Sequence, residues 1–199
     1  MSTATAATAS TPATRLFRAT AIGLALSAAG YIAAVFTPII EDPRYASPFL
    51  HPYSITVNAL NAIFLVALAV QLPTAWSDPR LPRWAVGVLA AGVAFTAVFP
   101  TSFATNVVHA TYLVPPELVP LLGEGIFVDA MGWPKQLLVA VGAFVVAIVG
   151  KRRAVLGWPA AIGLILTGLV TLLIWPFPPG ALFLGVTFAI LGARTESHA

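Results

Sequence analysis

Long stretches without charge decide what this chain can fold into. Four such stretches extend from Ala19 to Ile40, Tyr45 to Ser77, Trp84 to Pro116 and Ala154 to Ala193. A helix needs roughly 20 apolar residues to cross a hydrocarbon core about 30 Å thick, and each stretch is long enough for at least one crossing. The sequence therefore predicts an all-α, polytopic integral membrane helix bundle, placed in the cell membrane.

The composition supports the same class. Charged residues make up 9% of the 199 residues, whereas soluble domains carry about 25%. The net charge is +3, but the basic residues stand beside the apolar stretches and therefore indicate membrane orientation, not nucleic-acid binding. Cysteine is absent, which excludes disulfides, thiolate metal sites and a Cys nucleophile.

The domain organisation follows from the apolar stretches and the prolines. Residues 1–14 are an Ala/Thr/Ser tract that we expect to be a disordered tail, residues 15–194 a single transmembrane domain, and residues 195–199 a second tail. The last apolar stretch is long enough for two helices, with the turn at Pro176–Gly180. The final helix, Ala181–Ala193, would cover only about 20 Å, so we expect six spans, or five if it does not cross. The other predicted spans are Ala19–Ile40, Tyr53–Pro73, Trp84–Phe99 and Pro134–Gly150, with Pro100 kinking or ending the third.

The basic residues divide unequally between the two sides of such a bundle. Only Arg44 and Lys135 fall on one side, and the other eight of the ten fall on the opposite side. By the positive-inside rule, the side with eight is cytoplasmic and holds both termini. The outer side then carries two long loops, residues 41–52 and 100–135, with five of the seven acidic residues.

Candidate site residues gather in the longer outer loop and in the spans beside it. If the chain is helical from Pro100 onward, one polar face carries the side chains of Ser102, Thr105, His109 and Tyr112. In the second span, Asn58 and Asn61 share a face with Ser54 at the same end. Because polar side chains at membrane depth need partners, the two faces either line a ligand site or only hydrogen-bond between helices, at about 0.6 kcal/mol each.

Three carboxylates lie in the same loop, and Glu124 is flanked by Gly123 and Gly125. Carboxylates held close together separate their pKa values, so one could act as an acid and another as a base. We therefore predict His109, Glu124, Glu117 and Asp129 as candidate catalytic residues, with His109 and Glu124 in one pocket. The alternative is an interfacial loop whose acids point to water.

No motif names a cofactor or a reaction. The histidines His51 and His109 and the outer acids include no i, i+3 or i, i+4 ligand pair on a helix, so we predict no metal site. No nucleotide-binding, hydrolase or metalloprotease motif is present in the sequence. The cofactor is therefore left open.

Three functions fit these features. The first is a membrane-embedded enzyme or binder for a lipophilic small molecule, similar to an isoprenoid or a quinone, with a polar and acidic pocket at the outer face. The second is a structural or accessory subunit of a larger membrane complex. The third is a small transporter. The predicted spans of this chain lack the ionisable residues near the midplane that coupled carriers use. The expected partners are the lipid bilayer, a lipophilic small molecule and other membrane subunits.

Overall fold

The computed structural model describes residues 12–36, 51–112, 132–174 and 176–195, with side chains at 12–33, 51–98, 133–174 and 178–191. The described part of the chain is helical except for short turns, and it contains no strand. Its elements are α1 (Pro12–Phe36), α2 (Pro52–Ala75), α3 (Arg83–Tyr112), α6 (Gly132–Arg152), α7 (Trp158–Leu173), the π-helical turn η4 (Pro176–Gly180) and α8 (Ala181–Thr195). The predicted all-α class is confirmed.

Three helices are long and apolar enough to cross a membrane, namely Pro12–Ala33, Pro52–Ala75 and Trp133–Arg152. Three shorter apolar helical segments accompany them, at Arg83–Val98, Trp158–Leu173 and Pro178–Leu191. The structure therefore supports a membrane protein, while six crossings and the side of the termini stay predictions.

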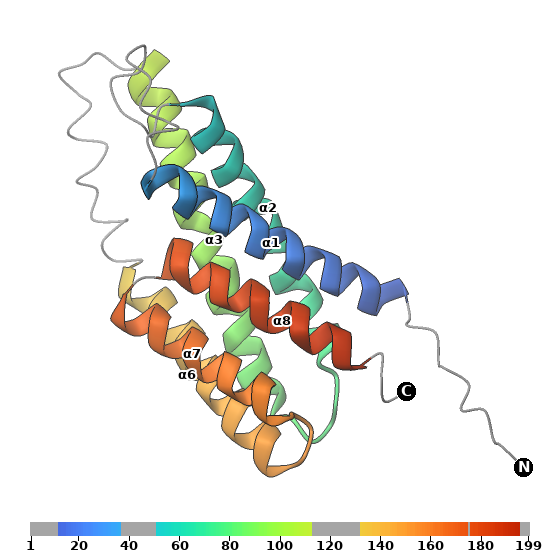
Figure 1. Cartoon of the computed structure of the whole chain (residues 1–199). Helices are drawn as coiled ribbons and strands as arrows, with labels where there is room; N and C mark the ends of the chain where they lie inside the picture. Colours follow the sequence, from blue (N-terminus) through green and yellow to red (C-terminus); the bar gives the residue numbers. More distant parts are fainter. Residues whose placement is uncertain (1–11, 37–50, 113–131, 175, 196–199) are drawn as a thin grey trace, which may run out of the picture.

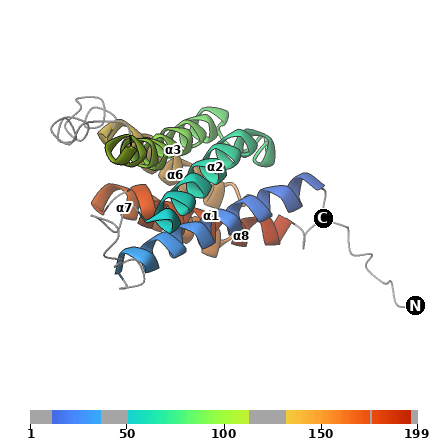
Figure 2. The same cartoon turned by 90° about the horizontal axis from the view of Figure 1, so that it is seen from above.

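The six α-helices form a closed ring. In the order α1, α2, α3, α6, α7, α8, each helix packs on the next, and α8 returns to α1 (Figures 1 and 2). Successive helices run in opposite directions (Figure 1). The turn η4 packs on α1, α3 and α6 as well as on its neighbours α7 and α8, so this proline-rich turn closes the interior of the ring.

One end of the ring collects basic residues, and we call it the basic end. The α2–α3 turn and the α6–α7 turn meet there, because Arg153 Nη1 donates a 2.7 Å hydrogen bond to the Arg80 carbonyl. The start of α1 and the last part of α8 lie at the same end, since the Phe188 ring centroid is 5.5 Å from Phe17 and 5.0 Å from Trp76. The described chain therefore begins and ends on one side of the bundle.

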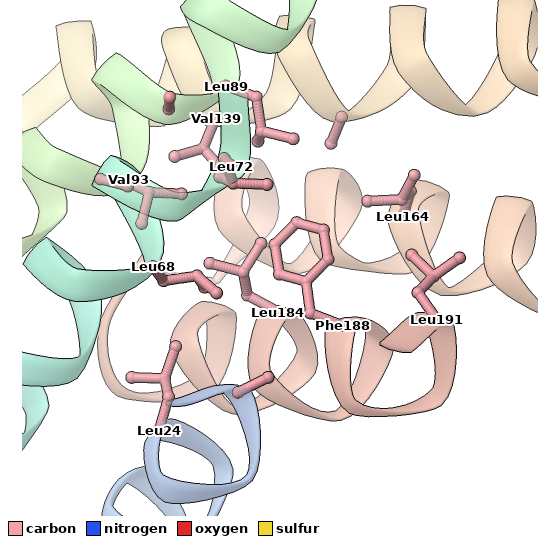
Figure 3. Packing of buried hydrophobic residues seen from close by; sticks show 14 of the residues in the cluster. Leu24, Leu68, Leu72, Leu89, Val93, Val139, Leu164, Leu184, Phe188 and Leu191 are labelled. Atoms are coloured by element: carbon pink, nitrogen blue, oxygen red, sulfur yellow. The ribbon is translucent and has the colours of Figure 1, made fainter. Parts of the chain in front are cut away.

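Apolar side chains fill the interior toward the basic end. Phe188 of α8 is fully buried among leucines and valines contributed by the other helices (Figure 3). Leu68 and Leu72 approach it from α2, and Leu164 approaches it from α7 (Figure 3). The ring is therefore a packed bundle at this level.

Helices α3 and α6 meet backbone to backbone. A Cβ atom on Gly92 would lie 2.5 Å from the Val139 amide nitrogen, and one on Gly142 would lie 2.6 Å from the Leu89 amide nitrogen. Glycine is required at both positions because any side chain would overlap with backbone atoms. These two contacts fix the antiparallel register of the pair, with Gly92 beside Val139.

The structure changes three predicted boundaries. Pro100 does not end the third helix, because α3 continues to Tyr112, so residues 100–112 of the predicted outer loop are helical. A proline costs one helical hydrogen bond, whereas ending the helix in apolar surroundings would leave several backbone groups unpaired. The segment Pro176–Gly180 is not a free turn but the π-helical start of the last helical unit. Helix α1 begins at Pro12, within the segment predicted to be a tail.

Candidate functional site: a buried polar layer

Helices α1 and α2 enclose a group of polar side chains, the α1–α2 polar cluster, at the end of the ring opposite the basic end. Its members are all buried: Ser27, Tyr31, Ser54, Asn58 and Asn61. The hydroxyl of Ser27 donates toward both Asn61 Oδ1 at 2.9 Å and the Leu24 carbonyl at 3.1 Å. The amide nitrogen of Asn61 donates to the Val57 carbonyl at 2.9 Å. Asn61 therefore links the two helices as an interhelical hydrogen-bonding residue.

Asn58 is the member whose bonding is incomplete. Its side chain is 1% exposed, and its Nδ2 donates to the Ser54 carbonyl at 3.0 Å. The Tyr31 side chain interacts with the same amide, yet Asn58 Oδ1 accepts no hydrogen bond from the residues whose side chains the structure describes. A buried acceptor without a donor costs about 1–3 kcal/mol, so such an atom is expected where a ligand or a water supplies the missing donor.

A second polar group lies between α3 and α6 and consists of Thr96, Lys135 and Gln136, all buried. Lys135 stands in the first turn of α6 with its side chain only 3% exposed. Given the contact of Gly92 with Val139, Thr96 and Lys135 lie at one level, because each is one helical turn further from the basic end.

The two polar groups lie at similar depth. Asn61 and Ala97 are equally far, along α2 and α3, from the turn that joins these helices. Thr96 is therefore near the level of Asn61, and Lys135 lies beside Thr96 on the next helix. We call these residues together the polar layer, namely the α1–α2 polar cluster with Thr96, Lys135 and Gln136. A lysine, two asparagines and a glutamine buried at one depth are costly in a membrane and are expected at functional sites.

The predicted ligand residues of α3 lie close to this layer along the helix axis. The backbone positions of Ser102, Thr105, His109 and Tyr112 are in the last part of α3, although their side chains lie outside the described residues. Counted from the same turn, Ser102 is near the level of Asn58, and His109 is roughly 10 Å further toward the end of the helix. Helices α2 and α3 run side by side there and project beyond α6 (Figure 1).

The predicted catalytic carboxylates Glu117, Glu124 and Asp129 lie outside the described residues. Their pairing with His109 therefore stays a prediction. In the described part of the chain, no group of three His, Cys, Asp or Glu side chains could hold a metal ion. His51 caps α2 instead, because its Nδ1 accepts a hydrogen bond from the Tyr53 amide at 3.1 Å.

The sequence-based reasoning missed part of the layer. The sequence does not indicate Ser27 as a site residue, and it predicts Lys135 at the border between the outer loop 100–135 and the span Pro134–Gly150. Tyr31 and Gln136 were not considered. The adjacent polar residues Lys135 and Gln136 at the start of an apolar helix are the sequence feature that could have indicated this part of the layer. Polar side chains at the end of a span can be either solvated or buried, so the sequence leaves both possibilities open.

A separate polar contact joins α1 and α2 nearer the basic end. Gln71 Nε2 donates to Thr20 Oγ1 at 3.2 Å, and Gln71 Oε1 is buried without a donor among the described residues. Leu24, Leu65 and Leu68 are fully buried between this contact and the polar layer. The described part of the chain therefore offers no continuous polar path along the α1–α2 interface.

At the basic end an exposed ion pair shapes the α2–α3 turn. Arg80 Nη2 lies 2.7 Å from Asp78 Oδ2, and Arg80 also donates its backbone N–H to Asp78 Oδ1 at 2.8 Å. The hydrogen bonds from Arg80 hold the pKa of the Asp78 carboxyl below its usual value. The same pair raises the pKa of Arg80. This arrangement orders a turn and carries no feature of a ligand site.

Comparison of the chain with known protein families, with characterised proteins and with solved structures found no match. The class that the fold and the site define is therefore an α-helical bundle of membrane character with a buried polar layer at one end.

Proposed function

We propose that this chain is a multi-pass protein of the cell membrane that binds a lipophilic small molecule, with the polar head of the ligand in the polar layer. The observation that carries the proposal is Asn58 Oδ1, an acceptor in a side chain that is 1% exposed, for which the described residues provide no donor. Such a group is retained at a cost in stability, and binding is the simplest benefit that offsets it.

The depth of the layer supports an amphiphilic ligand. From Trp133 to Arg152, helix α6 extends about 30 Å, which matches a hydrocarbon core. Trp133 is exposed at one end of this distance, and Trp84 and Trp158 are exposed at the basic end, as expected for interfacial anchors. Lys135 is two residues after Trp133 in α6, about 3 Å along the helix. The polar layer therefore lies near the interface, where lipid head groups reside.

The basic end supports the proposed orientation, in which six helices cross and both termini are cytoplasmic. Arg80, Arg83, Lys151, Arg152 and Arg153 all belong to the two turns at this end or to the helix ends beside them. Reporter fusions at Pro115 and at the C-terminus should give outside and inside signals, respectively. Equal signals would overturn the orientation, and an outside signal at the C-terminus alone would mean that α8 does not cross.

The packed interior weighs against the transporter function. Phe188, Leu68, Leu72, Leu89 and Leu164 are fully buried between the polar layer and the basic end, and carriers usually place ionisable groups in that region. A ligand that enters and leaves at one level of the membrane does not need a polar path through the bundle.

Extraction of the purified protein tests the proposal. Wild type, Asn58→Leu and the matched control Gln71→Leu are isolated in native lipid discs, and extracted compounds are compared by mass spectrometry. We expect one lipophilic compound to be enriched in wild type and in Gln71→Leu and to fall about tenfold in Asn58→Leu, which corresponds to about 1.4 kcal/mol. Equal compound profiles in all three, together with obligate co-purification of other membrane subunits, would favour the accessory-subunit function instead.

A further inference from the structure

The orientation of the Asn58 amide is fixed by its neighbours. Oxygen and nitrogen of an amide are exchangeable by a half turn of the side chain, but the atom facing the Ser54 carbonyl at 3.0 Å must be the donor nitrogen. An oxygen at that position would oppose another acceptor. The atom that points away is therefore Oδ1, and the unsatisfied group of the α1–α2 polar cluster is an acceptor.

One other contact in the cluster has more acceptors than donors. Ser27 has one hydroxyl proton for two acceptors, Asn61 Oδ1 and the Leu24 carbonyl. The amide nitrogens of Asn58 and Asn61 each carry two N–H donors, and each donates one hydrogen bond to a carbonyl of its own helix, that of Ser54 or Val57. Within the described part of the cluster, the acceptor left without a donor is Asn58 Oδ1, and a head group that only accepts hydrogen bonds would place lone pairs against it.

We infer that the α1–α2 polar cluster selects lipophilic molecules whose head group donates a hydrogen bond, that is, hydroxyl compounds in preference to the corresponding ketones, ethers or quinones. This inference rests on the proposed function and narrows its ligand class. Asn58 lies six residues after Pro52 in α2, about 9 Å along the helix, and residues 62–70, which follow Asn61, are apolar. A hydroxyl at the end of an apolar tail matches that distribution.

The discrimination should be large, because a site that hydrogen-bonds a hydroxyl leaves its own buried group unpaired when the hydroxyl is absent. An unpaired acceptor costs about 1–3 kcal/mol, which predicts that a ketone binds about tenfold or more weakly than the alcohol of equal chain length.

The test uses delipidated full-length protein in detergent and two probes of equal length, dodecan-1-ol and dodecan-2-one, with the thermal unfolding midpoint measured against probe concentration. Dodecanol should raise the midpoint of wild type and of Gln71→Leu at about tenfold lower concentration than the ketone. Neither probe should raise the midpoint of Asn58→Leu beyond the change produced by the detergent mixture. Asn58→Met replaces Asn58→Leu if the leucine variant does not fold.

The outcomes separate the inference from the proposed function. If alcohol and ketone act equally on wild type and both depend on Asn58, the donor selectivity is wrong while the binding function stands. If the alcohol acts equally on wild type and Asn58→Leu, Asn58 Oδ1 accepts only a water and the inference is overturned. If neither probe changes the wild-type midpoint up to its solubility limit, both the inference and the proposed lipophilic site in this cluster fail.

Discussion

The α3–α6 pair and the α1–α2 pair are held together by opposite means. In α3–α6, Gly92 and Gly142 bring backbone against backbone, and nothing at those contacts can yield. In α1–α2, Gly23 faces the ring of Phe64, a side chain that can turn aside, and the hydrogen bond from Ser27 to Asn61 crosses the interface. The first interface sets the architecture of the ring, whereas the second is adaptable and contains an unsatisfied acceptor.

The difference indicates where binding can occur without loss of the fold. Close glycine contacts depend on exact shape, so a ligand cannot enter there without separating two helices. An interface of movable side chains and incompletely paired amides can exchange a water for a head group at low cost. The comparison therefore supports a structural role for the α3–α6 contact and is consistent with the proposed ligand binding at α1–α2.

The largest effect is expected from Gly92→Leu. The new side chain would overlap with the backbone of Val139 and Leu138, and overpacking of this kind costs about 3 kcal/mol or more. The thermal midpoint of the purified protein should fall sharply. The matched control is Gly87→Leu on the same helix, where a Cβ meets nothing within 4 Å and a better helix former replaces glycine. Equal loss in both variants would show that leucine disturbs α3 itself and that close packing is not the cause.

The next effect has the opposite sign. Asn58→Leu removes a buried unsatisfied acceptor, and the Ser54 carbonyl that loses its side-chain donor can still bond within its helix. We expect the ligand-free protein to become more stable by about 1 kcal/mol while ligand binding is lost. Chemical unfolding of delipidated protein measures the first part. A clear loss of stability would mean that Asn58 is an interhelical structural residue, and the contrast between the two helix pairs would fail.

Much of the fold could be predicted from the sequence, because apolar stretches and prolines report directly on helices and their ends. Asn58 and Asn61, which are both buried in the structure, were also predicted as a polar pair. Their partner Ser27 was not, because the chain order suggests contact between α2 and α3 and says nothing about which face of α2 meets α1. The burial of Lys135 depends on the register that Gly92 and Gly142 impose, which is a property of two packed helices and not of either sequence segment.

A smaller effect is expected from Ser27→Ala, which removes a side-chain hydrogen bond of the polar layer between α1 and α2. Interhelical hydrogen bonds in membrane proteins average about 0.6 kcal/mol, so the free energy of unfolding should fall by about that amount. A double-mutant cycle with Asn61→Leu isolates the pair, and a coupling energy near zero would show that the Ser27 proton is used for the Leu24 carbonyl instead.

The smallest effect is expected at the basic end, where an exposed ion pair between Asp78 and Arg80 orders the α2–α3 turn. The hydrogen bonds from Arg80 lower the pKa of Asp78 below its usual value of 3.8. A carboxyl with a lowered pKa in the folded state contributes stability above its unfolded pKa and loses that contribution as the pH falls through its folded pKa. Wild type should therefore be slightly more stable than Asp78→Asn at neutral pH, and the difference in thermal midpoint should shrink as the pH falls below 3.8 and vanish once the pH is below the folded-state pKa of Asp78. The difference should be small, because the pair is exposed and screened by water and salt. A difference that grows as the pH falls would show that Asp78 is better tolerated in its protonated form and that Arg80 does not stabilise the turn through its charge.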